Sequence, residues 1–198
     1  MKKQDGVKID NMKKDLFLTS ILGIIGLSLI MAIKGFSYPL LPLFVLLFIF
    51  TYISIEDWKT GLISITLNGL TFICGGIYAF LEGIDIKTIG INLLVFVLPF
   101  ILIETIFQLF INRGKDEERF LVGGGDMILF GTMSLVLTFP EMVIMLFVSC
   151  LMSLITSKII QKSLVHFAPF IEVGFLVAFL FGEKLLEIWV NFNNSLYM

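Results

Sequence analysis

Long runs of apolar residues alternate with short polar stretches along the chain. Seven such runs occupy residues 16–33, 35–55, 62–81, 88–111, 127–139, 142–157 and 163–182. Crossing a bilayer takes about 20 residues of helix, and most of these runs reach or approach that length. They are continuously apolar, without the period-2 alternation of membrane barrel strands. The pattern predicts an all-α fold, a polytopic transmembrane helix bundle of about seven helices.

The fifth run, residues 127–139, is the weak point of this pattern. Its length gives a helix of roughly 20 Å, which is short of the ~30 Å hydrocarbon core. The run either extends back into the glycines before it or lies where the protein thins the membrane. Whether it spans fully stays open.

The composition agrees with a membrane bundle. Hydrophobic residues make up 58% of the chain and charged residues 15%, whereas soluble domains carry about 25% charged residues. Cys74 and Cys150 lie far apart inside apolar runs, so we expect small buried residues and no disulfide framework. A single histidine, His166, cannot form a zinc protease site, and we interpret it as interfacial. We expect no metal, no cofactor and no nucleic acid, with membrane lipid around the helices.

The distribution of basic residues predicts an orientation. Cytosolic loops are enriched in Lys and Arg. With the N-terminus in the cytosol, residues 1–15, 56–61, 112–126 and 158–162 are cytosolic and hold all but three of the 14 basic residues. The exceptions are Lys34, Lys87 and Lys184. This bias predicts a multi-pass protein of the plasma membrane with a basic cytosolic face.

Two aspartates fall at the cytosolic boundary in this topology. Asp57 closes the second run, Asp126 opens the fifth, and two crossings between them return the chain to one side. If they share a site, like-charge repulsion keeps one carboxyl protonated and the other ionised. The ionised one can take a proton from water, and the protonated one can hydrogen-bond a peptide carbonyl. The alternative, which spacing alone favours, is a pair of solvated charges or helix N-caps.

Three glycines, Gly123, Gly124 and Gly125, directly precede Asp126. Glycine permits a positive φ and close backbone approach, so an extended peptide could pass Asp126 with no side chain in its way. The alternative is a flexible turn before a helix, with Asp126 as its N-cap.

These residues also form part of a motif set. The stretch Gly123-Gly124-Gly125-Asp126 fits a G-x-G-D signature, and Asp57-Trp58-Lys59-Thr60-Gly61-Leu62-Ile63 fits a D-x-x-x-x-x-I context. Late in the chain, Phe167-Ala168-Pro169-Phe170-Ile171 is similar to F-G-P-F-L. In this order and spacing, over about residues 40–182, the set resembles the type IV prepilin and preflagellin peptidases, a GxGD family of membrane aspartic proteases.

The resemblance implies an aspartic endopeptidase that cleaves the basic leader from prepilin-like or preflagellin-like precursors at the cytosolic membrane edge. Asp57 and Asp126 would be the catalytic pair. The glycines at 123–125 and Pro169 would support the motifs, and Lys59 and Glu172 are secondary candidates. The insert with paired CxxC motifs, found in members that also methylate, is absent between these motifs, so the resemblance implies the short form with peptidase activity alone.

The same resemblance divides the chain into three parts. Residues 1–34 form an N-terminal cytosolic segment with an extra transmembrane helix. Residues 35–182 form a six-helix peptidase core, and residues 183–198 form a polar and aromatic tail. Which precursor is cleaved and the oligomeric state stay open.

Several positions depart from the family's usual motifs. Ser64 and Ile65 stand where Pro and then Asn or Asp are usual, Ile128 stands in place of Lys, and Ala168 in place of Gly. These changes affect local turn geometry and the substrate set, and they leave room for a divergent or inactive member. Both acids are retained.

Two other interpretations stay open. The chain could be a non-catalytic or transport-type membrane protein that uses the same acids, since paired acids also occur in ion pathways. It could also be a divergent GxGD protease that cuts within spanning helices. Glu104 and Glu172 lie deeper in apolar runs, where we expect hydrogen bonds between helices.

Overall fold

The computed structural model describes residues 2–110, 123–161 and 166–196, and every regular element among them is a helix. Three of these elements, α4, η1 and α5, follow one another without a break, so the described residues form seven continuous helices. The predicted all-α bundle is therefore confirmed. In chain order the elements are α1 (Lys2–Lys34), α2 (Leu40–Thr60), α3 (Ile65–Glu82), α4 (Ile86–Asn92), η1 (Leu93–Val97), α5 (Leu98–Phe110), α6 (Gly124–Val136), α7 (Phe139–Ile160) and α8 (Ala168–Leu196).

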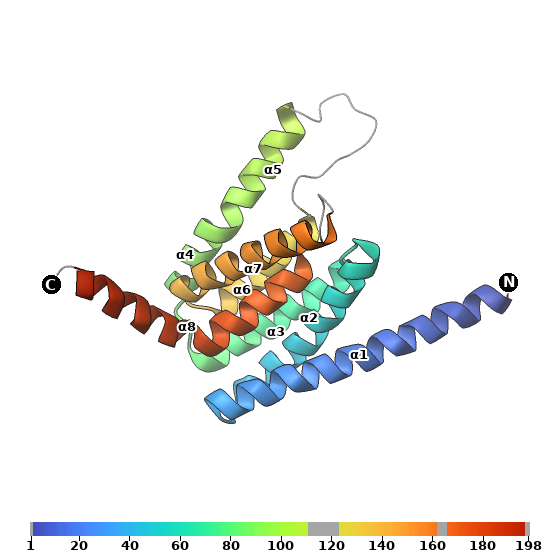
Figure 1. The fold of residues 1–198 in the computed structure, drawn as a ribbon, viewed down its shortest axis with the longest axis horizontal. Coiled ribbons are helices and arrows are strands. Elements are labelled where there is room, and N and C mark those ends of the chain that lie inside the picture. Colours follow the sequence, from blue (N-terminus) through green and yellow to red (C-terminus); the bar gives the residue numbers. More distant parts are fainter. Residues whose placement is uncertain (1, 111–122, 162–165, 197–198) are drawn as a thin grey trace.

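The packed bundle consists of α2, α3, α6, α7 and α8 (Figure 1). Helix α3 packs against both α2 and α6, and α8 packs against both α2 and α7. Helix α1 lies along α2, and α5 extends away from the bundle. The N-terminus lies toward the end where α2 finishes and α6 begins, which we call the aspartate end. The C-terminus lies toward the other end, which we call the opposite end.

In the part of the chain that the structure describes, four helical segments are long and apolar enough to cross a membrane: Leu40–Thr60, Ile65–Glu82, Ile86–Phe110 and Phe139–Ile160. The apolar segment of α1, Leu18–Lys34, and helix α6 are shorter. Helix α6 begins at Gly124 and so extends back into the glycines, which was one of the two expectations for the run 127–139. Because it also ends early, at Val136, its 13 residues still give a length of only about 20 Å.

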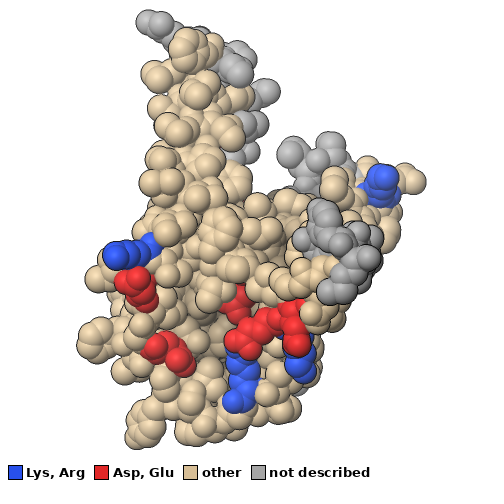
Figure 2. Space-filling view, turned by 90° about the vertical axis from the view of Figure 1, so that its left-hand side faces the viewer, with Lys and Arg blue, Asp and Glu red and all other residues tan. Residues whose placement is uncertain are grey.

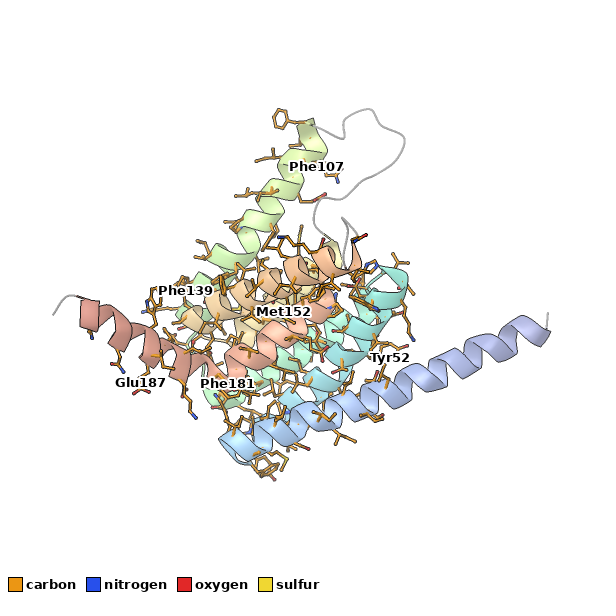
Figure 3. All side chains as sticks on the ribbon, in the orientation of Figure 1. Tyr52, Phe107, Phe139, Met152, Phe181 and Glu187 are labelled. Carbon is orange, nitrogen blue, oxygen red and sulfur yellow. The ribbon has the colours of Figure 1, made fainter. Side chains whose placement is uncertain are left out.

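The helix Ile86–Phe110 changes its winding before Pro99. Residues Leu93–Val97 form a π-helical turn. Proline has no N–H to donate, and its ring clashes with the carbonyl four residues earlier, so a wider turn at this point relieves the clash. Beyond it, α5 leaves the bundle, and the side chain of Phe107 lies well away from the packed helices (Figure 3). The apolar surface of α5 is thus available to lipid.

The opposite end of the molecule is charged. A pocket of about 390 Å³ there is lined by Lys34, Glu82, Glu141 and Glu183, among others. Acidic and basic side chains gather on this face in Figure 2. The Glu141 carboxylate accepts hydrogen bonds from the Thr138 backbone N–H (2.8 Å) and hydroxyl (2.9 Å), and so closes the turn between α6 and α7. Such a charged face belongs outside the apolar layer of a membrane.

Both terminal segments are helical beyond the limits of the apolar runs. Helix α1 begins at Lys2 and α8 continues to Leu196. The polar segment 1–15 is thus helical from Lys2, and the tail 183–198 is helical to Leu196. Most of the basic loop 112–126, position 162 and the first three positions of the seventh run, 163–165, lie outside the described residues.

Candidate active site

Asp57 lies in the last turn of α2 and is 5% exposed. One carboxylate oxygen, Oδ2, accepts the backbone N–H of Ala168 at 3.2 Å. The other, Oδ1, lies 3.8 Å from Nδ1 of His166. Because Ala168 is the first residue of α8, its N–H has no acceptor within that helix. The start of α8 therefore holds the side chain of Asp57, which is not a solvated loop charge.

A glycine turn makes room for the histidine beside Asp57. Helix α2 ends at Gly61, which has φ +68° and donates its N–H to the Asp57 carbonyl at 2.8 Å. This left-handed conformation favours glycine. A Cβ at Gly61 would lie only 2.7 Å from Cε1 of His166. The absence of a side chain at this position thus lets the imidazole lie against the end of α2.

Asp126 is the third residue of α6. The N-cap of this helix is Gly123, so the interpretation of Asp126 as an N-cap is wrong. Its Oδ2 turns back toward Gly123, at 3.1 Å from where a Cβ would be. Its Oδ1 is buried and has no hydrogen-bond partner among the described residues. One oxygen of this carboxyl is therefore left without a donor.

The two carboxyls lie close enough at the aspartate end to interact electrostatically. Helix α3 brings them together because it packs against both parent helices, α2 and α6. Its residue Asn68 donates a hydrogen bond to the carbonyl oxygen of Gly125 at 3.0 Å. The backbone directly before Asp126 is thus tied to α3.

The three glycines before Asp126 meet different surroundings. A Cβ at Gly125 would lie 2.7 Å from Cβ of Ile63, in the segment between α2 and α3. A Cβ at Gly124 would meet nothing within 4 Å. None of the three has a positive φ. Of the two reasons considered for these glycines, close approach therefore applies at Gly125 and positive φ applies at none.

The two secondary candidates, Lys59 and Glu172, lie in a neighbouring pocket together with the motif residue Pro169. The three residues line a cavity of about 300 Å³ between α1, α2 and α8, and neither aspartate lines it. The Glu172 carboxylate accepts a hydrogen bond from the Thr51 hydroxyl of α2. The hydrogen bond between helices expected for Glu172 is therefore confirmed. Glu104 accepts a hydrogen bond from Gln108 on its own helix at 2.6 Å, and a bond from it to another helix stays a prediction.

One departure from the usual motif changes the surface beside Asp126. Ile128 lines an apolar pocket of about 370 Å³ together with Phe72, Val97 and Met127, among others. A lysine at this position would place a charge in that pocket. Another departure, Ser64, is the N-cap residue of α3.

Sequence reasoning missed Asn68 and the contact between His166 and Asp57. Asn68 is fully buried, and a polar residue inside an apolar run was a signal that could have found it. No signal in the sequence pointed to the histidine contact. Among the described residues, no group of three or more His, Cys, Asp or Glu is placed to hold a metal ion.

Comparison with known proteins adds one match. The model of the type IV leader peptidase family matches residues 44–157, which is more than half of the chain. No curated protein and no solved structure matches the chain. The matched range contains both aspartates and the helices that connect them.

Proposed function

The chain belongs to the type IV leader peptidase family, and from this premise we propose that it is an aspartic endopeptidase acting on prepilin-like precursors. The family and the four apolar helices make it a multi-pass membrane peptidase. The proposal adds the chemistry, the substrate and the orientation. The proposal rests on Asp57 and Asp126, which come from two separate helices and lie within electrostatic range of each other at one end of the bundle.

The proposed chemistry needs no covalent intermediate. The ionised carboxylate takes a proton from a water molecule while the water oxygen attacks the carbonyl carbon of the peptide bond. The protonated carboxyl donates a hydrogen bond to the carbonyl oxygen, where negative charge develops. As the tetrahedral intermediate collapses, the C–N bond breaks and the leaving nitrogen receives a proton. Two carboxyls that share one proton supply both functions.

A precursor with a basic leader and an apolar helix suits this location. The aspartates lie at one end of the bundle, and the apolar pocket lined by Met127 and Ile128 lies beside Asp126. The scissile bond of such a precursor lies at the boundary of its apolar helix. In the proposed orientation the aspartate end faces the cytosol of the plasma membrane, in line with the basic residues of its loops.

The test is the replacement of each aspartate by its amide. Asp57→Asn and Asp126→Asn should each lower the rate of precursor cleavage by about 10²–10⁴-fold, because an amide provides neither the base nor the shared proton. The assay follows the size shift of a prepilin-like precursor reconstituted with the protein in liposomes. Asp85→Asn is the matched control: Asp85 is exposed and caps α4 at the opposite end, and asparagine caps a helix as well as aspartate.

Each outcome is informative. Loss of cleavage in both variants, with normal membrane insertion and an active Asp85→Asn control, supports the proposal. Full activity in either catalytic variant refutes it. An ion flux across the same liposomes that depends on Asp57 would favour a transport protein instead.

A further inference from the structure

The two aspartates have unlike surroundings. Both oxygens of Asp57 face nitrogen atoms: Oδ2 accepts the Ala168 N–H at 3.2 Å, and Oδ1 lies 3.8 Å from His166 Nδ1. The imidazole of His166 is 46% exposed, so water and protons can reach it. For Asp126, by contrast, Oδ1 is buried without a hydrogen-bond partner among the described residues.

We propose that His166 is a positioning residue that keeps Asp57 as the ionised member of the pair, which leaves the shared proton on Asp126. An N–H donor and a neighbouring cation both favour the ionised form of a carboxyl. A buried oxygen without a donor favours the neutral form, because the charge would lose its hydration. The catalytic consequence rests on the proposed function: Asp57 takes the proton from water and Asp126 donates to the carbonyl.

Other charged groups also lie near the pair. On α2, Glu56 and Lys59 flank Asp57 in the sequence, and on α8 Glu172 is bonded to Thr51. Among the described residues, the imidazole makes one ion-pair contact, with Asp57. A change in the charge of His166 should therefore act first on Asp57.

The experiment uses the histidine itself as the probe. The chain has one histidine, so isotope-labelled histidine gives a single imidazole signal by NMR in the whole protein, in nanodiscs. The titration is compared for the wild type, Asp57→Asn, Asp126→Asn and the double variant. Imidazole changes charge in an accessible pH range, between about pH 5 and 8.

The expected shifts follow from the assigned protons. Asp57→Asn removes an anion beside the imidazolium, so the midpoint of the titration should fall. Asp126→Asn replaces a neutral acid by a neutral amide, so the midpoint should stay near that of the wild type, and the double variant should match Asp57→Asn. A rise of the midpoint in Asp126→Asn would reverse the roles, because loss of an ionised Asp126 would let Asp57 ionise beside the imidazole. An unchanged midpoint in every variant would show that the charge of His166 is not coupled to either aspartate, and would overturn the proposal.

Cleavage kinetics supply a second readout. His166→Gln removes the group that can carry a positive charge beside Asp57, so the acidic limb of kcat/KM should move to higher pH, with a fall of about threefold or more at the acidic end. His166→Lys keeps a cation and should keep the limb in place. An equal loss at every pH in both variants would indicate packing alone and overturn the proposal. The titration needs no cleavage, so its failure is distinct from failure of the proposed function.

Discussion

Gly125 is where α6 comes closest to the segment that precedes α3, and replacing it by alanine tests how the site is held together. The added Cβ would lie 2.7 Å from Cβ, 3.0 Å from Cγ2 and 3.1 Å from Cδ1 of Ile63. Carbon atoms in good contact are about 3.5–4.0 Å apart. Either α6 or the facing segment must therefore move by about 1 Å. Because Asp126 is the next residue, that movement displaces its carboxyl.

The effect on activity should exceed the effect on stability. Overpacking costs about 1–3 kcal/mol, and the better helix propensity of alanine offsets about 1 kcal/mol of this. Unfolding should therefore shift by no more than about 2 kcal/mol. A displacement of about 1 Å at a reacting group can lower the rate by about 10²-fold. We expect Gly125→Ala to insert and fold while cleaving the precursor about 100 times more slowly.

Thermal unfolding in detergent and precursor cleavage in liposomes measure the two effects separately. Gly124→Ala is the control for folding, because it has the same gain in helix propensity and its Cβ meets nothing within 4 Å. It should be as stable as the wild type or slightly more stable. Adding Ile63→Gly to Gly125→Ala removes all three facing atoms and should recover part of the loss. If Gly125→Ala cleaves at the wild-type rate, close approach is not what this glycine provides.

Two further pairs of variants separate strain or folding from function. Gly61 and Gly83 both end helices with φ near +67°, so replacement by alanine should lower the free energy of unfolding by about 1–2 kcal/mol at either position. Only Gly61→Ala, whose Cβ would meet His166, should also slow cleavage. Equal cleavage rates in the two variants would contradict the role of that contact. Asn68 and Asn92 are buried and both donate to backbone carbonyls of the α6 region. Leucine at either should cost about 1–3 kcal/mol of stability, but only Asn68→Leu should lower kcat of the folded protein, and a matching fall in Asn92→Leu would refute this.

The helices were predictable because lipid leaves the backbone few choices. Without water to bond N–H and C=O groups, an apolar run must satisfy them within one helix. The run 35–55 and the acidic stretch after it accordingly became α2, with Asp57 in its last turn. The ends were less predictable. Helix α6 takes in two glycines and stops at Val136, since Thr138 and Glu141 begin the next helix.

The pairing of the aspartates was only partly predictable. The distribution of basic residues predicted that Asp57 and Asp126 lie at one depth, but it did not predict which helices are neighbours. That depends on α3, which packs against both α2 and α6. The interpretation of His166 as interfacial stays a prediction. Its contact with Asp57 depends on the left-handed turn at Gly61, which the sequence pattern did not predict.

The roles of the two aspartates follow from side-chain contacts rather than from position along their own helices. Asp126 lies in the first turn of α6, where the helix dipole favours an anion, and Asp57 lies at the end of α2, where it does not. Position alone would thus ionise Asp126. However, Asp57 also faces the start of α8 and accepts the Ala168 N–H, while Oδ1 of Asp126 accepts no hydrogen bond from the described residues. A direct hydrogen bond to a charged acceptor contributes about 1.5–3 kcal/mol, whereas a helix dipole contributes about 0.3–1 kcal/mol. The hydrogen bond should therefore outweigh the dipole and keep Asp57 ionised, and the histidine titration tests this.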